Sequence, residues 1–367
     1  MFRGGCDSIM VTNKYYFSFE LLALRPLWRF AHRCTGVVLL PIAFILWIFP
    51  FRLACINLKA FGHLCLEPYL AKIEYNRHYR IFVFGNEAIA ANASLYEFTK
   101  TQYPTIENPL AIKILSLFYN WRFLQVDIGK YCYFKDNSPP LYSAVICKYG
   151  SSKKSLDYQL NLFRWIRDLK PSRQFQEFQD LYNGRFVCIH WRADLSNPLH
   201  NLRSSTSKAL EDTIPFLHSL GYGVCLVGNG YDEDDPLILS LERSSRRSYI
   251  VFKNKSYYGL DDVYALANCK FAILGDSGIS AVAAVLDKPV IVHNFFSTGL
   301  PKLRSSWRYC YKRIKIPGGN SLAPVANKLR YVADGLVAES IGLEAKETAS
   351  SEVLLSTRSL INNLSNE

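Results

Sequence analysis

The sequence lacks the cysteine patterns and targeting signals that mark several common classes of protein. Its ten cysteines form no CxxC pair and show no spacing typical of a zinc site. No secretory signal with a small-residue cleavage site is present, so we expect reduced thiols and a cytosolic setting. Internal repeats and low-complexity tracts are absent too. Cys188, Cys225 and Cys269 lie in or beside apolar runs, which predicts small buried hydrophobes.

No long run of lysine or arginine occurs, although the 367 residues carry a formal net charge of +12. A basic balance indicates a polyanionic partner, such as nucleic acid, an anionic membrane surface or a phosphate-bearing substrate. Because the charges are scattered, we expect no nucleic-acid partner. The length and the hydrophobic fraction of 49% suffice for two folded domains, each with its own core.

Charge is missing altogether from residues 35–51, TGVVLLPIAFILWIFPF, which follow the regularly spaced Arg25, Arg29 and Arg33. A spanning helix needs about 20 apolar residues, and this stretch is slightly shorter and contains two prolines. It fits a short or tilted membrane span, a segment lying in one leaflet, or a buried core helix. We favour membrane association, with the basic flank on the cytoplasmic side and Trp47 at the interface.

The most informative stretch is 271–294, FAILGDSGISAVAAVLDKPVIVHN. The apolar run 271–274 predicts a buried strand, 275–278 a tight loop and 279–286 a helix, before a second apolar strand. Such a loop lies at the carboxyl end of its strand, where parallel sheets bind ligands, and its N–H groups could hold a phosphate. The alternative is that Asp276 or Ser277 only caps the helix.

Other segments extend this unit into an α/β protein. Strands are predicted at 81–84, 186–189, 224–227 and 249–252, and helices at 88–99, 155–181, around 210–217 and at 260–267. The alternation predicts doubly wound parallel sheets. We expect a membrane-associating segment at 1–54, domains at 55–183 and 184–320, and a C-terminal region at 321–367, with a helix returning to the first domain and a partly disordered polar tail from Glu344.

Several short motifs occur in an order that resembles a known family. They are GHL at 62–64, HWR at 190–192, GDSG at 275–278 and KP followed by HN at 288–294. Over about residues 55–320, this order is similar to bacterial glycosyltransferases with the two-domain GT-B fold. HWR and GDSG also resemble the HxR and SSG-type loops of fucosyltransferase-like enzymes. Two departures are the serines that follow Arg203 and the presence of Asp276 where a small residue is common.

The resemblance implies an α/β protein whose two Rossmann-like domains face a cleft. It implies a glycosyltransferase that moves a sugar from a nucleotide-diphosphate donor to a glycan or lipid-linked acceptor, with inversion at the anomeric carbon. The expected process is surface polysaccharide synthesis, and the expected location is the inner face of the cell membrane. No DxD motif follows a convincing strand, so we expect no metal and no cofactor. Arginines and helix N-termini would then stabilise the departing diphosphate. The expected donor-binding residues are His190, Arg192, Arg203, Asp261, Asp276, Ser277 and Gly278.

An inverting transfer also needs a base for the acceptor hydroxyl, and the resemblance places it in the first domain. His63 and Glu67 are the candidates, with an ordinary structural role as the alternative. Each donor-side residue has a similar alternative: Arg192 and Arg203 as solvated surface arginines, His190 as a core histidine, and Asp261 as a helix N-terminal acid. Two other functions stay open, a non-catalytic nucleotide- or carbohydrate-binding protein and a basic membrane-bound partner of an assembly complex.

Overall fold

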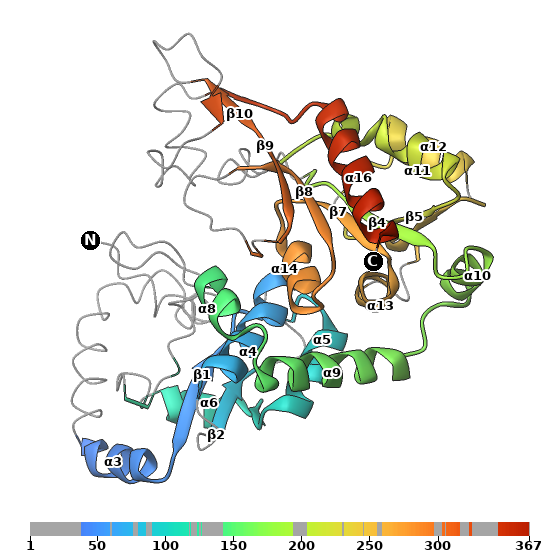
Figure 1. The fold of residues 1–367 in the computed structure, drawn as a ribbon. Helices are drawn as coiled ribbons and strands as arrows, with labels where there is room; N and C mark the ends of the chain where they lie inside the picture. Colours follow the sequence, from blue (N-terminus) through green and yellow to red (C-terminus); the bar gives the residue numbers. More distant parts are fainter. Residues whose placement is uncertain are drawn as a thin grey trace, which may run out of the picture. The chain divides into compact units, whose positions relative to one another are not determined.

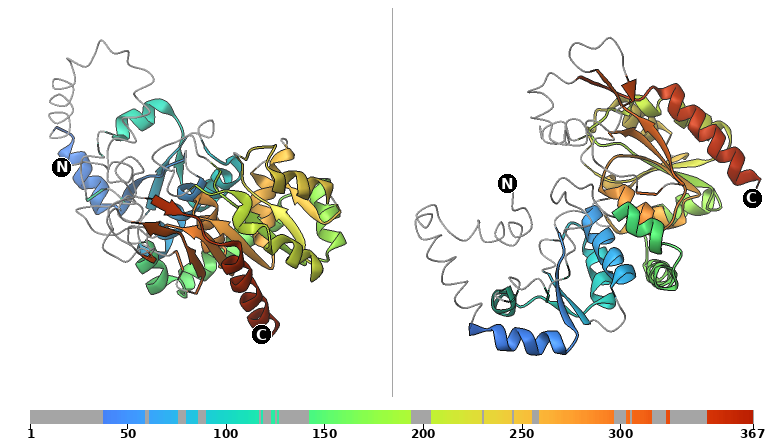
Figure 2. Two further views of the ribbon diagram at one scale, coloured as in Figure 1. Left: turned by 90° about the horizontal axis from the view of Figure 1, so that it is seen from above. Right: turned by 60° about the vertical axis from the view of Figure 1, so that its left-hand side comes forward.

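The computed structural model describes residues 38–58, 61–75, 80–85, 90–116, 118, 123–124, 126, 142–193, 204–229, 231–244, 246–254, 259–296, 303–304, 306–315, 323–324 and 344–366. The chain divides into two compact units, Met1–Lys135 and Asp136–Glu367, called unit 1 and unit 2 below. Figures 1 and 2 show the helices and strands of each. Both units are mixed α/β structures built on parallel strands.

Unit 1 contains a three-stranded parallel sheet in the order β1-β2-β3. The strands are β1 (Phe51–Cys55), β2 (Arg80–Phe84) and β3 (Thr105–Ile106), and helices α4 (Phe61–Glu74) and α5 (Ala93–Gln102) alternate with them. β1 begins inside the apolar stretch 35–51, so the expected start of this domain at residue 55 was too late. α5 begins later than predicted because the Asn92 side chain caps it, accepting a hydrogen bond from the Leu95 N–H.

The apolar N-terminal stretch forms a short helix of unit 1, α3 (Leu40–Ile48), which packs against β1. Ala43 is buried there with Leu53, Phe118 and Leu124, and helix α6 (Pro109–Ser116) packs against the same cluster. Within the described ranges, no helix is both long enough and apolar enough to cross a membrane. Residues 1–37 lie outside the described part of the chain.

Unit 2 contains a six-stranded sheet, predicted from the sequence as a doubly wound parallel sheet and confirmed as such. All its strand pairs are parallel, and the order is β6-β5-β4-β7-β8-β9. Numbered along the chain, this is 3-2-1-4-5-6, the order of dinucleotide-binding sheets. The strands are β4 (Phe186–His190), β5 (Gly223–Leu226), β6 (Ser248–Ile250), β7 (Phe271–Gly275), β8 (Val290–Phe295) and β9 (Arg308–Tyr311).

Helices cover both faces of this sheet (Figure 1). One face packs on α11 (Thr213–Ser219), α12 (Pro236–Arg243) and α16 (Ser350–Ser365), and the core between them includes Val187, Val224 and Ile273. The other carries α13 (Leu260–Asn268) and α14 (Gly278–Val285). The strand residues alternate between the faces, and Cys188, Cys225 and Cys269 are buried free thiols as predicted.

The polar stretch expected to bridge the domains belongs to unit 2. It forms α9 (Lys153–Asp168) and α10 (Arg173–Leu181), broken at Lys170-Pro171 as the sequence predicts. α9 packs on α13, and the Gln159 side-chain amide donates to the Val285 carbonyl at 2.9 Å. The two compact units divide at residues 135/136, whereas a domain boundary at 183/184 was expected from the sequence.

The C-terminal tail was wrongly expected to be partly disordered. Residues 350–365 form α16, whose Val353 is fully buried and whose Leu360, Ile361 and Leu364 pack against the core of unit 2. The spacing of these four residues gives the helix one apolar face, which its polar composition conceals. α16 packs on α11, β8 and β9 of unit 2, whereas a helix that returns to the first domain was expected from the sequence. Before it, β10 (Arg313–Lys315), β11 (Ala323–Pro324) and β12 (Glu344–Lys346) form a small antiparallel sheet.

Candidate functional site

The strand order of the six-stranded sheet reverses between β4 and β7. β5 and β6 extend from β4 to one side, and β8 and β9 extend from β7 to the other. In sheets of this type, the crevice outside the carboxyl ends of the strands at the reversal is where ligands bind. β4 ends at His190, just before Arg192, and β7 ends at Gly275, just before Ser277. Two stretches far apart in the sequence, both predicted to bind the donor, therefore meet at the same edge of the sheet.

A direct contact joins these two stretches. The Ser277 hydroxyl lies 3.3 Å from Nδ1 of His190, within hydrogen-bond distance. His190 is only 6% exposed, and burial, with the nearby His293 and the positive charge of Arg192, lowers its pKa to about 3. The imidazole is therefore neutral at neutral pH. Arg192 follows His190 by two residues, just after the end of β4.

The N-terminus of α14 opens at this contact. Ser277 occupies the N-cap position in an extended conformation, but its side chain makes no capping hydrogen bond, because the hydroxyl turns to His190 instead. The helix behind it is apolar and buried from Ile279 to Val285, whereas Asp276, Ser277 and Gly278 are half-buried. The positive end of a helix dipole and its first N–H groups thus lie at the carboxyl ends of β4 and β7, an arrangement that suits an anion.

Glycine at position 275 lets the two strand ends approach each other. A Cβ at Gly275 would lie 3.3 Å from the Arg192 backbone nitrogen and 3.4 Å from the Trp191 Cα. The Arg192 carbonyl also accepts a hydrogen bond from the Ser205 N–H at 2.7 Å, which fixes both ends of the loop that starts after β4. Arg203, a predicted donor-binding residue, belongs to this loop and lies outside the described residues.

The turn after β5 forms a third wall of the site. Gly228 has φ +89°, and a Cβ there would lie 2.7 Å from Cδ2 of His190. The Gly228 N–H donates to the Asp262 carboxylate at 2.8 Å, so the first turn of α13 holds the turn in place. Burial raises the pKa of Asp262 to about 6, opposed by this hydrogen bond and assisted by the charge of Asp261. Asp262 therefore holds the backbone turn that lies against the His190 ring.

His293 and Asn294, the HN pair of the resemblance, had no role assigned from the sequence. The Nε2–H of His293 donates to the His190 carbonyl at 2.8 Å, and its Nδ1 accepts from the Asn294 side-chain amide at 3.1 Å. Burial lowers the pKa of His293 to about 4, although the bond to His190 opposes the shift. These two hydrogen bonds fix the tautomer of His293, and the first of them ties the end of β4 to β8.

A buried lysine near the site was also missed. Lys312 is 4% exposed, and its ammonium group donates to the Ser204 carbonyl. Burial lowers its pKa, whereas the carboxylates of Glu347 and Asp276 act in the opposite direction. The Lys312 side chain thus fixes the chain at Ser204, where the described residues resume after the loop that follows β4. No local pattern in the sequence marked Lys312.

Asp261, an expected donor-binding residue, takes part in a buried hydrogen-bond network inside unit 2. Its carboxylate is fully buried and accepts three hydrogen bonds, from the Ser172 N–H at 3.0 Å, the Ser172 hydroxyl at 2.7 Å and the Tyr249 hydroxyl at 2.7 Å. Asp261 therefore ties the N-terminus of α10 to β6 and α13. This role is structural, as in the alternative of a helix N-terminal acid.

In unit 1, the two predicted catalytic residues contact each other on α4. Nδ1 of His63 lies 2.8 Å from Oε1 of Glu67, whose Oε2 accepts from the Asn57 N–H at 2.9 Å. Glu67 is buried, and the His63 side chain is 29% exposed. In the neutral ring, this contact favours the proton on Nδ1 and the lone pair on Nε2, the form needed for a general base.

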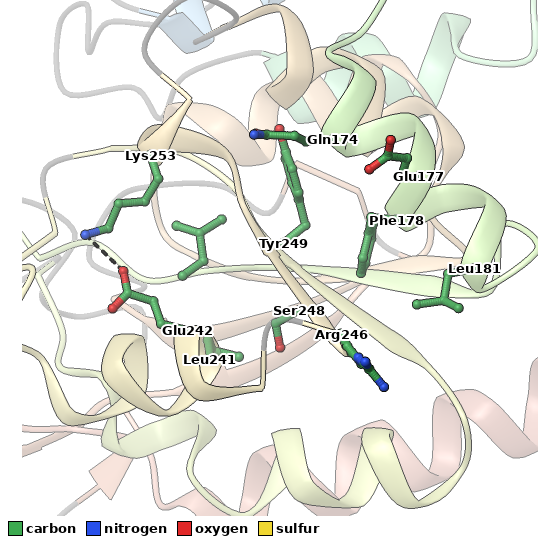
Figure 3. Close-up of a pocket in the computed structure, with 11 residues that line it drawn as sticks. Gln174, Glu177, Phe178, Leu181, Leu241, Glu242, Arg246, Ser248, Tyr249 and Lys253 are labelled. Atoms are coloured by element: carbon green, nitrogen blue, oxygen red, sulfur yellow. Dashed lines mark ion pairs between the residues drawn. The ribbon is translucent and has the colours of Figure 1, made fainter.

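A pocket of about 630 Å³ lies at the edge strand β6, between α10 and α12 (Figure 3). Its walls include Phe178, Leu241 and Tyr249, and Lys253 at its rim pairs with Glu242 at 3.0 Å. None of the residues predicted to form the site lines it. Among the described residues, no group of three or more histidine, cysteine, aspartate or glutamate side chains could hold a metal ion.

No protein-family model matches the chain, and no curated protein matches it. Solved structures similar to it include Escherichia coli ADP-heptose lps heptosyltransferase II, with 16% identity, 78% of this chain and 98% of that chain covered, and a TM-score of 0.40. A glycosyltransferase family 9 protein from Veillonella parvula DSM 2008 has 10% identity, 86% and 98% coverage, and a TM-score of 0.46. The iron-containing dodecameric glycosyltransferase TibC from enterotoxigenic E. coli H10407 has 13% identity, 86% and 77% coverage, and a TM-score of 0.42. Likeness at this level assigns no activity to the chain.

Proposed function

We propose that the chain is a glycosyltransferase that takes a sugar from a nucleoside-diphosphate donor, and that the diphosphate binds at the carboxyl ends of β4 and β7. One observation carries the proposal: the Ser277 hydroxyl at the N-terminus of α14 meets His190 beside Arg192, where the strand order reverses. Both the position in the sheet and the chemical groups gathered there suit a pyrophosphate.

Each group would have a separate task. The Gly278 N–H and the Ser277 hydroxyl would donate to diphosphate oxygens, and the Arg192 guanidinium would pair with them. His190 is neutral and in contact with Ser277, so it would orient the hydroxyl without adding charge. Lys312 would offset the charge of Asp276, which otherwise would repel the ligand.

The same groups would stabilise the leaving group. When the bond from the sugar to the diphosphate breaks, negative charge grows on the diphosphate, and fixed dipoles and arginines lower the barrier. We propose that Arg192, Arg203 and the N-terminus of α14 carry this charge without a metal ion. The proposed reaction is inverting, with His63 as the base and Glu67 as the carboxylate that orients its ring. The GT-B arrangement and a glycan or lipid-linked acceptor in surface polysaccharide synthesis belong to the same proposal.

The test is binding and turnover with Arg192→Ala. The wild-type chain should bind at least one of ADP, UDP, GDP and CDP, which isothermal titration measures. Arg192→Ala should weaken this binding at least tenfold, because an ion-paired hydrogen bond contributes about 1.5–3 kcal/mol. The same variant should lose hydrolysis of the matching nucleotide sugar.

Arg173→Ala is the matched control, since that side chain is 90% exposed on α10 and forms an ion pair with Glu177 one turn further along the same helix. It should bind and hydrolyse like the wild type. If all four nucleotides fail to bind, the donor site is wrong. If one binds tightly but its sugar conjugates are never turned over, a non-catalytic nucleotide-binding protein is the better description.

A further inference from the structure

Helix α3 presents an apolar surface that the fold of unit 1 leaves exposed. Ala43 is fully buried, and Leu39 and Leu46 pack against the same cluster, so one side of the helix is fixed to the unit. Its other side chains remain largely exposed, with exposed fractions of 43–59% for Ile42, Phe44, Ile45, Trp47 and Ile48. Large apolar side chains clustered in this way mark an interaction surface.

A second helix extends this surface. α6 packs on the cluster around Ala43 through Ile112 and Leu115, and it exposes Leu110 at 66% and Ile114 at 50%. The ring of Phe123 lies 6.3 Å from that of Trp47. Two helices about 70 residues apart in the sequence therefore expose apolar side chains around one small core.

We propose that these exposed faces of α3 and α6, together called the apolar surface below, dock unit 1 onto an anionic lipid bilayer. Because α3 stays packed through Ala43, its exposed side would lie in the plane of the membrane interface, where an apolar face enters the boundary between headgroups and acyl chains. Trp47, with its ring 5.5 Å from that of Phe44, suits this boundary, since tryptophan is enriched there.

Charge distinguishes a bilayer from a protein partner. No charged residue occurs between Arg33 and Arg52, so nothing on α3 opposes transfer into lipid. The preceding residues 21–33 contain three arginines and no acid, and Lys113 is exposed on α6 between the apolar positions. An apolar surface without acids on α3 and with an exposed lysine on α6 complements an anionic membrane, and each cation near the membrane adds about 1 kcal/mol of attraction.

Flotation of the full chain with lipid vesicles tests this apolar surface. The assay does not measure catalysis, so its result is independent of the proposed transferase activity. The vesicles are phosphatidylcholine alone, or phosphatidylcholine in which about one lipid in three is the anionic phosphatidylglycerol. The wild-type chain should float with the anionic vesicles and bind the neutral ones at least tenfold more weakly. Ile48→Glu and Ile114→Glu should each weaken binding about tenfold or more, because each loses the burial of one large apolar side chain.

Leu355→Glu is the matched control, because Leu355 is 64% exposed on α16 in unit 2. It should bind vesicles like the wild type, and all three variants should keep the wild-type circular dichroism and melting temperature. Absence of binding to anionic vesicles would overturn the proposal, as would equal losses in Leu355→Glu and Ile48→Glu. A dimer of the wild type that Ile48→Glu dissociates, without vesicle binding, would assign the surface to a second copy instead.

Discussion

At the scale of single residues, the proposed site depends on the close packing of Gly228, His190 and Ser277. Gly228 lies so close to the His190 ring that even a methyl group would overlap it, and its backbone has the positive φ that favours glycine. The His190 ring in turn contacts the Ser277 hydroxyl, and the His190 backbone carbonyl accepts a hydrogen bond from the His293 ring. A small change in one of these residues therefore moves the others.

Gly228→Ala tests this packing. Positive φ alone costs about 1–2 kcal/mol for alanine, and the overlap with His190 adds about 1–3 kcal/mol. Gly221 is the matched control, since its φ is +75° but a Cβ there meets nothing within 4 Å. Urea denaturation should show a larger loss of stability for Gly228→Ala than for Gly221→Ala, and equal losses would contradict the packing described.

The buried histidines predict how stability depends on pH. The pKa values of His190 and His293 are lowered from 6.5 to about 3 and about 4, so between pH 6 and 4 both stay neutral in the folded chain but gain protons on unfolding. Each then lowers the free energy of unfolding by about 1.4 kcal/mol per pH unit as the pH falls. Asp262, whose pKa is raised from 3.8 to about 6, acts with the opposite sign in this range.

Replacing His190 with asparagine isolates one of these contributions. The stability difference between the wild type and His190→Asn should shrink by about 1.4 kcal/mol per pH unit from pH 6 to pH 4, because only the wild type retains the buried ring. Denaturant unfolding at several pH values measures it. A difference that does not change with pH would contradict a buried neutral histidine at this position.

At the scale of secondary-structure elements, α14 is the part of the site that most directly favours an anion. Gly278→Glu places a carboxylate in its first turn, where it should interact favourably with the helix dipole by about 0.3–1 kcal/mol. The same charge would repel a diphosphate about 4 Å away by about 1–4 kcal/mol. We therefore expect unchanged or higher stability together with at least tenfold weaker nucleotide binding.

Gly278→Gln is the control for this pair of effects, because it has nearly the same shape without the charge. Calorimetric titration with the preferred nucleoside diphosphate, and thermal melting of both variants, provide the comparison. Equal affinity of the glutamate and glutamine variants would mean that no anion approaches the helix.

Elements with strong local patterns could be predicted closely from the sequence. The strand at Phe271, the loop after it and α14 were predicted to within about a residue, since an apolar run, a glycine-rich break and a proline stop are local signals. The rule that parallel strands end at one edge places His190 and Ser277 at the same edge of the sheet, and their direct contact was seen only in the structure. Local sequence signals were therefore enough to predict the bounds of these strands and helices.

The roles of buried polar side chains could not be predicted in this way. Asp261 was expected at the donor, whereas in the structure its carboxylate accepts a hydrogen bond from Ser172, which is 89 residues away, and nothing near Asp261 in the sequence indicates that contact. His293 and the His190 carbonyl are 103 residues apart, and Lys312 reaches Ser204 across 108 residues. Such contacts depend on tertiary packing, and the spacing of residues along the chain does not reveal which distant residues meet.

At the scale of the whole molecule, the two units carry different parts of the proposed activity. Unit 2 holds the proposed diphosphate site on its six-stranded sheet, and unit 1 holds the His63–Glu67 pair and the apolar surface of α3 and α6. A lipid-linked acceptor would explain why membrane docking and a base belong to one unit. Each unit can be tested separately, since vesicle binding and nucleotide binding have independent readouts.

The most direct measurement is a crystal structure of the full chain with the nucleoside diphosphate that it binds best. We predict that the diphosphate oxygens lie within hydrogen-bond distance of the Gly278 N–H and the Ser277 hydroxyl, with the Arg192 guanidinium on the same phosphates. A nucleotide seated instead in the pocket beside β6 (Figure 3), with the ends of β4 and β7 untouched, would contradict the account.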